Sequence, residues 1–82
     1  MDVNSTPQEI SDYKRNWMMK NPHSVRLHID LHIEGKNWCR HYLQRWQWSM
    51  ETYTGPYEHT FFFERKKDAE NFAKLYPEFT NV

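Results

Sequence analysis

The strongest pattern along the chain is a strict alternation of apolar and polar side chains over residues 25–34. The odd positions are all aliphatic: Val25, Leu27, Ile29, Leu31 and Ile33. Because successive side chains of a strand point to opposite faces of a sheet, the alternation predicts a strand with one dry face and one wet face. We expect this strand to end at the breaking residues Gly35 and Asn37.

Before that strand, apolar residues recur at helical spacing. They are Ile10, Tyr13, Trp17 and Met18. Just ahead of them, Thr6 and Glu9 have the spacing of a capping box, and Pro7 suits the first position of a helix. The pattern predicts a helix over residues 7–20. Asn21-Pro22 should end it, because the residue before a proline avoids helical geometry.

Two further helices and two strands are predicted after residue 37. A helix over residues 38–46 has an apolar stripe of Trp38, Tyr42, Leu43 and Trp46. The period then changes to two over residues 47–53, and a turn at Thr54-Gly55-Pro56 leads into an aromatic strand at 58–64. The last helix covers residues 66–76. We expect Pro77 to end it and Phe79 to fold back onto its end.

The predicted class is α+β, with an N-terminal helix followed by a β-α-β-β-α unit, which is a ferredoxin-like half. The helices at 38–46 and 66–76 should cover the dry face of a three-stranded sheet. A strand–helix–strand unit favours parallel strands, and the 54–57 turn favours an antiparallel hairpin. We assign residues 1–5 to a disordered tail and 6–82 to a single domain. The wet face, a sheet edge and a partner chain all remain open as positions for the first helix.

Composition narrows the class of protein. The 82 residues include 11 basic and 11 acidic side chains, and aromatics make up 17%, so the core is expected to be aromatic. No apolar run approaches the ~18–20 residues of a membrane span. The N-terminus lacks the features of a secretory signal, and two glycines supply no glycine-rich phosphate loop. The lone Cys39 favours a reducing compartment. We expect a cytoplasmic protein, in the host cytoplasm if it is viral.

The segment 61–70, FFFERKKDAE, resembles the third strand and second helix of an RNA-recognition motif. With Ala69 aligned to the helix alanine of that family, Phe61 and Phe63 fall on core-facing positions. The base-stacking positions then fall on Glu58 and Thr60, which cannot stack on a base. The resemblance therefore implies the ferredoxin-like half and brings no RNA site with it.

A second resemblance covers residues 25–76. It rests on the segments Gly35-Lys36-Asn37-Trp38-Cys39, Trp46-Gln47-Trp48, Phe61-Phe62-Phe63 and Asp68-Ala69, with Phe72. In these the chain is similar to small uncharacterised proteins of tailed phages, especially cyanophages, although that group usually begins at the first strand. The resemblance implies no established activity. It implies a viral setting, in which small proteins often bind and modulate or inhibit host proteins.

The sequence gives little support for catalytic or metal-binding chemistry. His28, Asp30 and His32 share the predicted wet face, and His59 could join them, but same-face neighbours lie ~6.6–6.8 Å apart, which makes convergence on one ion difficult. Cys39 and His41 point to different sides of a helix, so a packed core cysteine is favoured over a nucleophile. We predict no enzymatic activity, metal or cofactor.

The expected function is binding of another macromolecule, first of all a protein, because Trp, Tyr, Met and Arg are favoured at the centres of protein interfaces. The partner-binding candidates are Tyr13, Trp17, Met18, Arg26, His28, Tyr53 and Phe62. The aromatic excess and the exposed sheet edges also suggest a homodimer.

The alternative is a nucleic-acid binder. Its candidates are Lys14, Arg15, Lys20, Arg40 and Arg45. Residues 14–45 carry seven Lys and Arg against Asp30 and Glu34, and Arg40 and Arg45 lie near Trp46 in the sequence. A solvated helix face is the other interpretation of this charge, and the zero net charge supports it.

Overall fold

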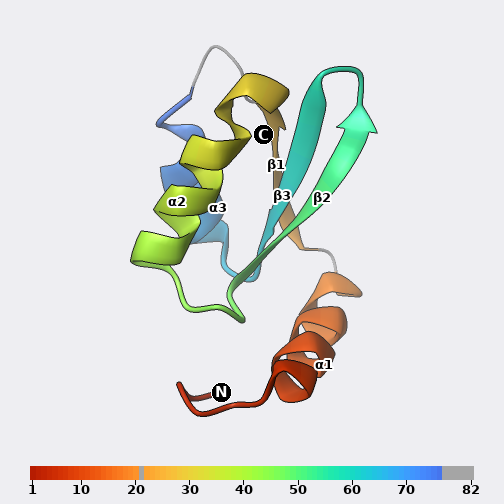
Figure 1. Cartoon of the computed structure of the whole chain (residues 1–82), viewed down its shortest axis with the longest axis vertical. Coiled ribbons are helices and arrows are strands. Elements are labelled where there is room, and N and C mark those ends of the chain that lie inside the picture. The colour runs from red at the N-terminus through yellow and green to blue at the C-terminus, as the bar shows by residue number, and fades with distance from the viewer. Residues whose placement is uncertain (21, 77–82) are drawn as a thin grey trace.

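The computed structural model describes residues 1–20 and 22–76, which form three α-helices and a three-stranded antiparallel sheet (Figure 1). The elements are α1 (Pro7–Met18), β1 (His23–His28), a 3-10 turn (Ile29–Leu31), α2 (His32–Tyr42), β2 (Trp48–Gly55), β3 (Glu58–Phe63) and α3 (Lys66–Ala73). The α+β class and the N-terminal helix are confirmed, and the arrangement is compatible with a ferredoxin-like half. The expectations for Asn21, Pro77 and Phe79 lie outside the described residues.

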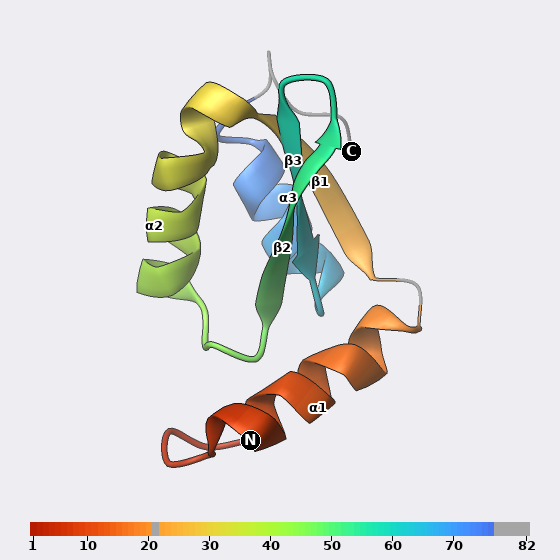
Figure 2. The ribbon, with the colours of Figure 1, turned by 45° about the vertical axis from the view of Figure 1, so that its right-hand side comes forward.

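The sheet has the order β1-β3-β2, with β3 antiparallel to both neighbours. The outer strands β1 and β2 therefore run in the same direction, as expected for two strands joined through a helix, and β2 and β3 form the predicted hairpin. Both α2 and α3 lie on one side of the sheet (Figures 1 and 2). Val25 of β1 and Phe61 of β3 are paired and fully buried on that side.

The core is centred on Phe72 of α3. Its ring centroid lies 4.9 Å from that of Phe61, 5.1 Å from Phe63 and 5.5 Å from Trp38. Leu27, Cys39 and Ala69 complete the buried cluster. The aromatic core that the composition indicates is thus built from the central strand β3 and from the two helices α2 and α3 that cover the sheet.

The first strand is shorter than predicted, because β1 ends at His28 and α2 begins at His32. Ile33, expected on the dry face of the strand, is 55% exposed on the helix. The turn at 29–31 is held locally: the Asp30 N–H donates to His28 Nδ1 at 3.1 Å, and His32 Nδ1 lies 2.7 Å from the Ile29 carbonyl oxygen. The polar side chains of the alternating pattern therefore stabilise this turn through local hydrogen bonds that they would not make in a strand.

A helical pattern is also present in this segment, and Gly35 conceals it. Leu31, Gly35, Cys39 and Leu43 recur every four residues, and these four positions face the core. Glycine adds no apolar side chain to the pattern, so the alternation dominates it. Helix α2 consequently covers residues 32–42 and not 38–46 as predicted, and Trp46 lies in the turn that follows.

At Gly35 the backbone of α2 lies close to the sheet and to α3. A Cβ atom at this position would lie 2.9 Å from Leu27 Cδ2, 3.0 Å from Phe61 Cζ and 3.1 Å from Phe72 Cζ. All three neighbours are fully buried, so none of them can move away cheaply. Gly35 is therefore a packing residue in the helix and not the strand breaker that we expected.

Helix α1 has the predicted capping box, in which Thr6 Oγ1 accepts from the Glu9 N–H at 3.2 Å and Glu9 Oε1 accepts from the Thr6 N–H at 3.0 Å. The helix lies across the end of the sheet where β2 begins and β3 ends (Figures 1 and 2). The Tyr13 hydroxyl donates to Glu64, and Trp17 Nε1 donates to the Trp46 carbonyl at 2.8 Å. Helix α1, whose position the sequence left open, therefore packs against its own chain.

The hairpin between β2 and β3 contains an irregularity. Glu51 pairs with Thr60 and Gly55 pairs with Glu58, so residues 52–54 bulge opposite a single residue, His59. Tyr53 in this bulge has φ 53°, and its N–H donates to His59 Nδ1 at 2.9 Å. His59 is 2% exposed, so its ring is a buried part of the hairpin and not a surface ligand.

The other boundaries lie close to the predicted ones. Strand β3 ends at Phe63, one residue early, and α3 ends at Ala73, followed by a turn in which the Leu75 N–H donates to the Phe72 carbonyl at 3.1 Å. In the expected tail, the Ser5 N–H donates to the Asp2 carbonyl at 3.2 Å, which closes a turn.

We predict that Gly35→Ala destabilises the protein. Overpacking a core costs about 1–3 kcal/mol, and the better helix propensity of alanine returns about 1 kcal/mol, which leaves a net loss of about 1 kcal/mol in the free energy of unfolding. Urea denaturation measures it. The matched control is Asn37→Ala at an exposed site of α2, which should gain up to about 0.5 kcal/mol. A gain at Gly35 equal to that of the control would contradict the close contact.

We also predict that acidification weakens the fold through His59. Burial, followed by the nearby His32 and Lys36, holds the pKa of His59 below its ordinary value of about 6.5. Stability is therefore present above that ordinary pKa and is lost as the pH falls below it, because the unfolded chain takes up the proton first. Urea unfolding at pH 7, 6 and 5 should show falling stability.

The variant His59→Asn keeps a hydrogen-bond acceptor for the Tyr53 N–H and cannot be protonated. It should flatten the dependence of stability on pH, whereas the same change at the exposed His41 should not. A dependence that is equally steep in His59→Asn and in the wild type would assign the acid sensitivity to other groups.

Candidate anion-binding site

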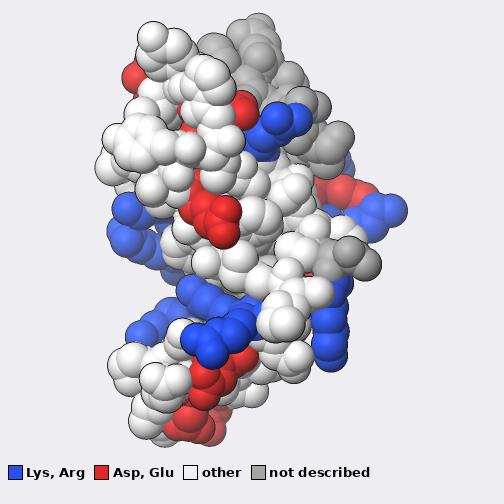
Figure 3. Space-filling view, turned by 90° about the vertical axis from the view of Figure 1, so that its right-hand side faces the viewer, with Lys and Arg blue, Asp and Glu red and all other residues white. Residues whose placement is uncertain are grey.

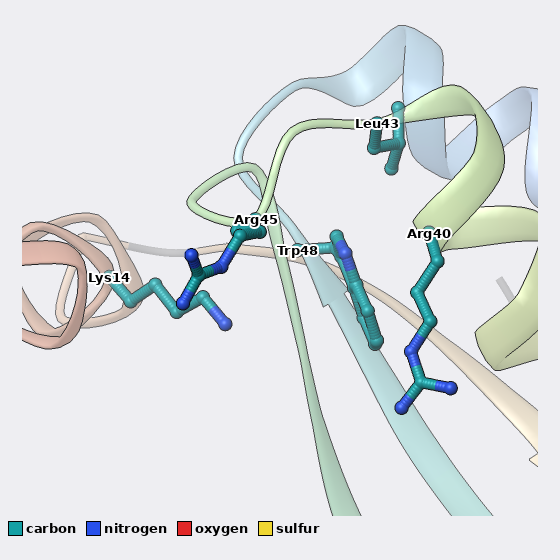
Figure 4. A pocket seen from close by; sticks show the side chains of 5 residues that line it. All are labelled: Lys14, Arg40, Leu43, Arg45 and Trp48. Atoms are coloured by element: carbon teal, nitrogen blue, oxygen red, sulfur yellow. The ribbon is translucent and has the colours of Figure 1, made fainter. Parts of the chain in front are cut away.

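A pocket of about 310 Å³ opens where α1, α2 and the start of β2 meet. Lys14, Arg40, Leu43, Arg45 and Trp48 line it. The close view in Figure 4 has Lys14 and Arg45 on one side of the Trp48 indole and Arg40 on the other. Cationic side chains from separate elements therefore line one pocket together with this aromatic ring.

The connection between α2 and β2 sets the position of two of these residues. The Leu43 N–H closes the end of α2 on the Cys39 carbonyl at 2.9 Å, and the chain then turns through mutual bonds between Gln44 and Gln47. Arg45 lies in this turn, between those two glutamines. The turn is short, so Arg45 stays near both the end of α2 and the first residue of β2.

Helix α1 supplies the third cation. The bond from Trp17 Nε1 to the Trp46 carbonyl fixes α1 against the same turn, and Lys14 lies one helical turn before Trp17. Lys14 Nζ reaches a point 5.7 Å from the centroid of the Trp48 ring. This distance is within the range of a cation–π interaction, so the lysine is held over the indole.

Trp48 itself is anchored from the core side. Its ring is stacked with Phe61 at an interplanar angle of 20° and a centroid distance of 6.3 Å. The tryptophan is half-buried, and it also contributes to the pocket wall. A ring held in this way is pre-positioned for a flat or apolar part of a ligand.

The positive charge of the pocket is uncompensated. Lys14, Arg40 and Arg45 form no ion pair with any acidic side chain of the described residues. Some cations elsewhere on the surface are paired, for example Arg26 with Glu58 at 3.6 Å and Arg65 with Asp68 at 2.8 Å. The zero net charge of the chain therefore hides an uneven distribution.

Burial and the nearby Arg45 lower the pKa of Lys14 below its ordinary value. Both causes act against the charged ammonium group, so the folded chain holds this cation at some cost. An anion bound in the pocket would remove the repulsion. Figure 3 shows Lys and Arg side chains gathered at the junction between α1 and the rest of the molecule, with acidic side chains farther down α1.

A second hollow, of about 450 Å³, adjoins the pocket along α1 and shares Lys14 with it. It runs between α1 and the outer face of β2. Its other lining residues are Ser11, Arg15, Met18, Met19, Ser49 and Glu51. Of the five cations in the nucleic-acid set, the structure thus places Lys14, Arg40 and Arg45 in the pocket and Arg15 beside it, whereas Lys20 lines neither hollow.

The protein-binding candidates differ in how far their side chains are engaged within the chain. Trp17 is buried and Tyr13 is bonded to Glu64, so both side chains are engaged within the chain and not presented to a partner. Arg26 is paired with Glu58, and His28 Nδ1 lies 3.5 Å from Asp30 Oδ2. Met18 lines the second hollow, Tyr53 is exposed at the hairpin, and Phe62 is half-buried on the outer face of β3.

The residues weighed for metal and nucleophile chemistry are also separated. Among residues 1–20 and 22–76, no group of three or more His, Cys, Asp and Glu is placed to hold a metal ion. Cys39 is fully buried, and burial is the main reason that its pKa rises to about 12. A thiol of this kind is protonated at neutral pH and is inert as a nucleophile.

Sequence reasoning missed Trp48 and Leu43 as site residues. It associated Arg40 and Arg45 with Trp46, which is two positions away from the ring that they flank. The change from helical to two-residue period after residue 46 was the available signal, because it marks Trp48 as the first residue of a strand beside the turn. The contribution of Lys14 depends on the packing of α1, which no local pattern records.

None of the described helices has the length and apolar character needed to cross a membrane. Comparison with protein-family models, with curated proteins and with solved structures finds no match to this chain. The resemblance to tailed-phage proteins therefore stays a prediction.

Proposed function

We propose that the protein is a non-catalytic binding domain for single-stranded nucleic acid and that the pocket around Trp48 is its binding site. The observation that carries this proposal is one pocket in which a half-buried tryptophan lies among three cations, Lys14, Arg40 and Arg45, that form no ion pair within the described residues. Proteins that bind single strands combine positive charge along the backbone path with aromatic rings for the bases.

The arrangement of the cations favours a polymer over an isolated anion. Arg40 lies on one side of the indole, and Lys14 and Arg45 lie on the other (Figure 4). A strand that crosses the pocket would place successive phosphates on the two sides and a base against Trp48. Arginine forks match phosphate oxygens in pairs, which suits this role.

The shape of the site favours single strands over duplexes. A base can reach a ring that lines a pocket only when it is unstacked from its neighbours. The outer face of the sheet, which RNA-recognition motifs use, has Glu58 and Thr60 at the stacking positions, so this face is not the proposed site. The proposal therefore rests on the α1–α2–β2 junction alone.

Protein binding is the second candidate function, and the hairpin favours it. Tyr53 and Tyr57 are 74% and 75% exposed, and both have positive φ, which is uncommon for a residue of this size. Exposed aromatics on a strained hairpin are suited to a protein interface. Modulation or inhibition of a host protein by a phage-encoded, cytoplasmic homodimer is the finer form of this second proposal.

We predict that the protein binds a fluorescein-labelled octathymidylate in a salt-dependent manner. With about three phosphate contacts, the slope of log affinity against log salt should be about −2 for a single strand. Fluorescence anisotropy measures it, with a duplex of the same length as a weaker ligand. The double variant Arg40→Gln/Arg45→Gln should lose about tenfold in affinity and reduce the magnitude of the slope to about 0.7.

The matched control for this experiment is Lys67→Gln, which removes an exposed cation on α3 that lies outside the pocket and has no ion pair among the described residues. It should keep the affinity of the wild type. Equal losses of affinity in the control and in the double variant would show that the binding depends only on non-specific charge. Displacement of the oligonucleotide by polyglutamate at the same concentration of charge would indicate that the pocket binds acidic proteins. That result would overturn the nucleic-acid assignment.

We further predict that Lys14→Met weakens oligonucleotide binding without weakening the fold. Methionine is a flexible, unbranched side chain that can lie against Trp48, and it removes a cation that burial and Arg45 disfavour. The midpoint of urea unfolding of the free protein should be equal to or above that of the wild type, whereas the affinity should fall several-fold. A clear drop in the midpoint would instead assign Lys14 a structural role.

A further inference from the structure

We infer that the hollow between α1 and β2 is a second nucleotide subsite, which continues the strand that the Trp48 pocket holds and selects bases with an exocyclic amino group. This inference rests on the proposed function. The hollow and the pocket share Lys14, so a ligand backbone that passes this lysine enters the hollow directly.

The hollow follows one face of α1. Its residues on the helix include Ser11, Lys14, Arg15 and Met18, which are spaced at three, four and seven residues and therefore lie in a row. This row is next to the buried stripe of Ile10 and Trp17, so the contacts that fix α1 to the domain also fix the wall of the hollow. The opposite wall is the outer face of β2.

Charge sets the orientation of a nucleotide in this hollow. Arg15 is exposed and forms no ion pair within the described residues, so it is available to a phosphate. Glu51, on the β2 wall, would repel a phosphate. The backbone therefore runs past Lys14 and Arg15, and the base points across the hollow towards β2.

The chemistry of the two walls then suggests which base fits. Met18 and Met19 offer a flexible apolar surface to the flat face of a base. The Glu51 carboxylate can accept a hydrogen bond from the exocyclic amino group of cytosine, and thymine has no such group. The subsite should therefore favour cytosine over thymine.

Length and sequence series test this inference. Unlabelled dCMP, tetracytidylate and tetrathymidylate compete with a labelled octacytidylate for the wild-type protein and for variants. We expect tetracytidylate to bind about tenfold or more tightly than dCMP and several-fold more tightly than tetrathymidylate. Glu51→Gln should reduce the difference between the two tetramers, because the amide is a weaker acceptor.

Two charge variants separate the subsites. Arg15→Gln should weaken tetracytidylate about threefold to tenfold and leave dCMP unchanged, whereas Arg45→Gln should weaken both ligands. Lys67→Gln is the control and should weaken neither. The second subsite is overturned if Arg45→Gln weakens binding while Arg15→Gln binds as tightly as the control. It is also overturned if the wild type binds both tetramers with equal affinity. In either case the proposed function stands. If the wild type binds no oligonucleotide, both proposals fail.

Discussion

The structure depends on the contact that Gly35 makes possible between α2 and the sheet. With no side chain at this position, the helix backbone approaches Leu27, Phe61 and Phe72 to a distance at which a Cβ atom would overlap them. This contact allows α2 to pack closely on the sheet. The turn that follows α2 carries Arg45 and leads into Trp48, so the packing of this helix helps to position two residues of the pocket.

The second constraint is the attachment of α1. An isolated helix of 12 residues is marginal in water, so its position has to come from contacts with the domain. Trp17 supplies these contacts with a buried ring and a bond to the Trp46 carbonyl, and Tyr13 adds a bond to Glu64. The large aromatics that suggested a partner-facing helix are thus used to bring Lys14 to the pocket. The same residue types serve interfaces within a chain and between chains, which is why the sequence left both positions open.

The predictable parts of the molecule were those in which one local signal acts alone. The capping box of α1, the aromatic strand β3 and the hairpin turn each have a pattern that no other signal opposes. The segment from Ile29 to Ile33 failed because two patterns overlap there. The alternating pattern was visible, whereas the helical one contained a glycine whose value lies in tertiary packing. For the same reason the cations of the site could be named from the sequence, but Trp48 and the shared position of Lys14 could not, since they depend on two helices meeting at one turn.

The pocket also illustrates how a neutral chain can hold a positively charged site. Some cations elsewhere on the surface have an acidic partner, as Lys66 has Glu70 at 3.8 Å, and such exposed pairs add little stability. At the pocket the arrangement is reversed: Lys14 lies beside Arg45, and both burial and that neighbour lower its pKa. Crowded like charges are unfavourable in the free protein, and stability alone does not account for them. An anionic ligand would convert that repulsion into binding energy, because it would bring negative charge to Lys14 and Arg45 beside an anchored ring. The charge that costs stability in the free chain is therefore the feature that best indicates its function.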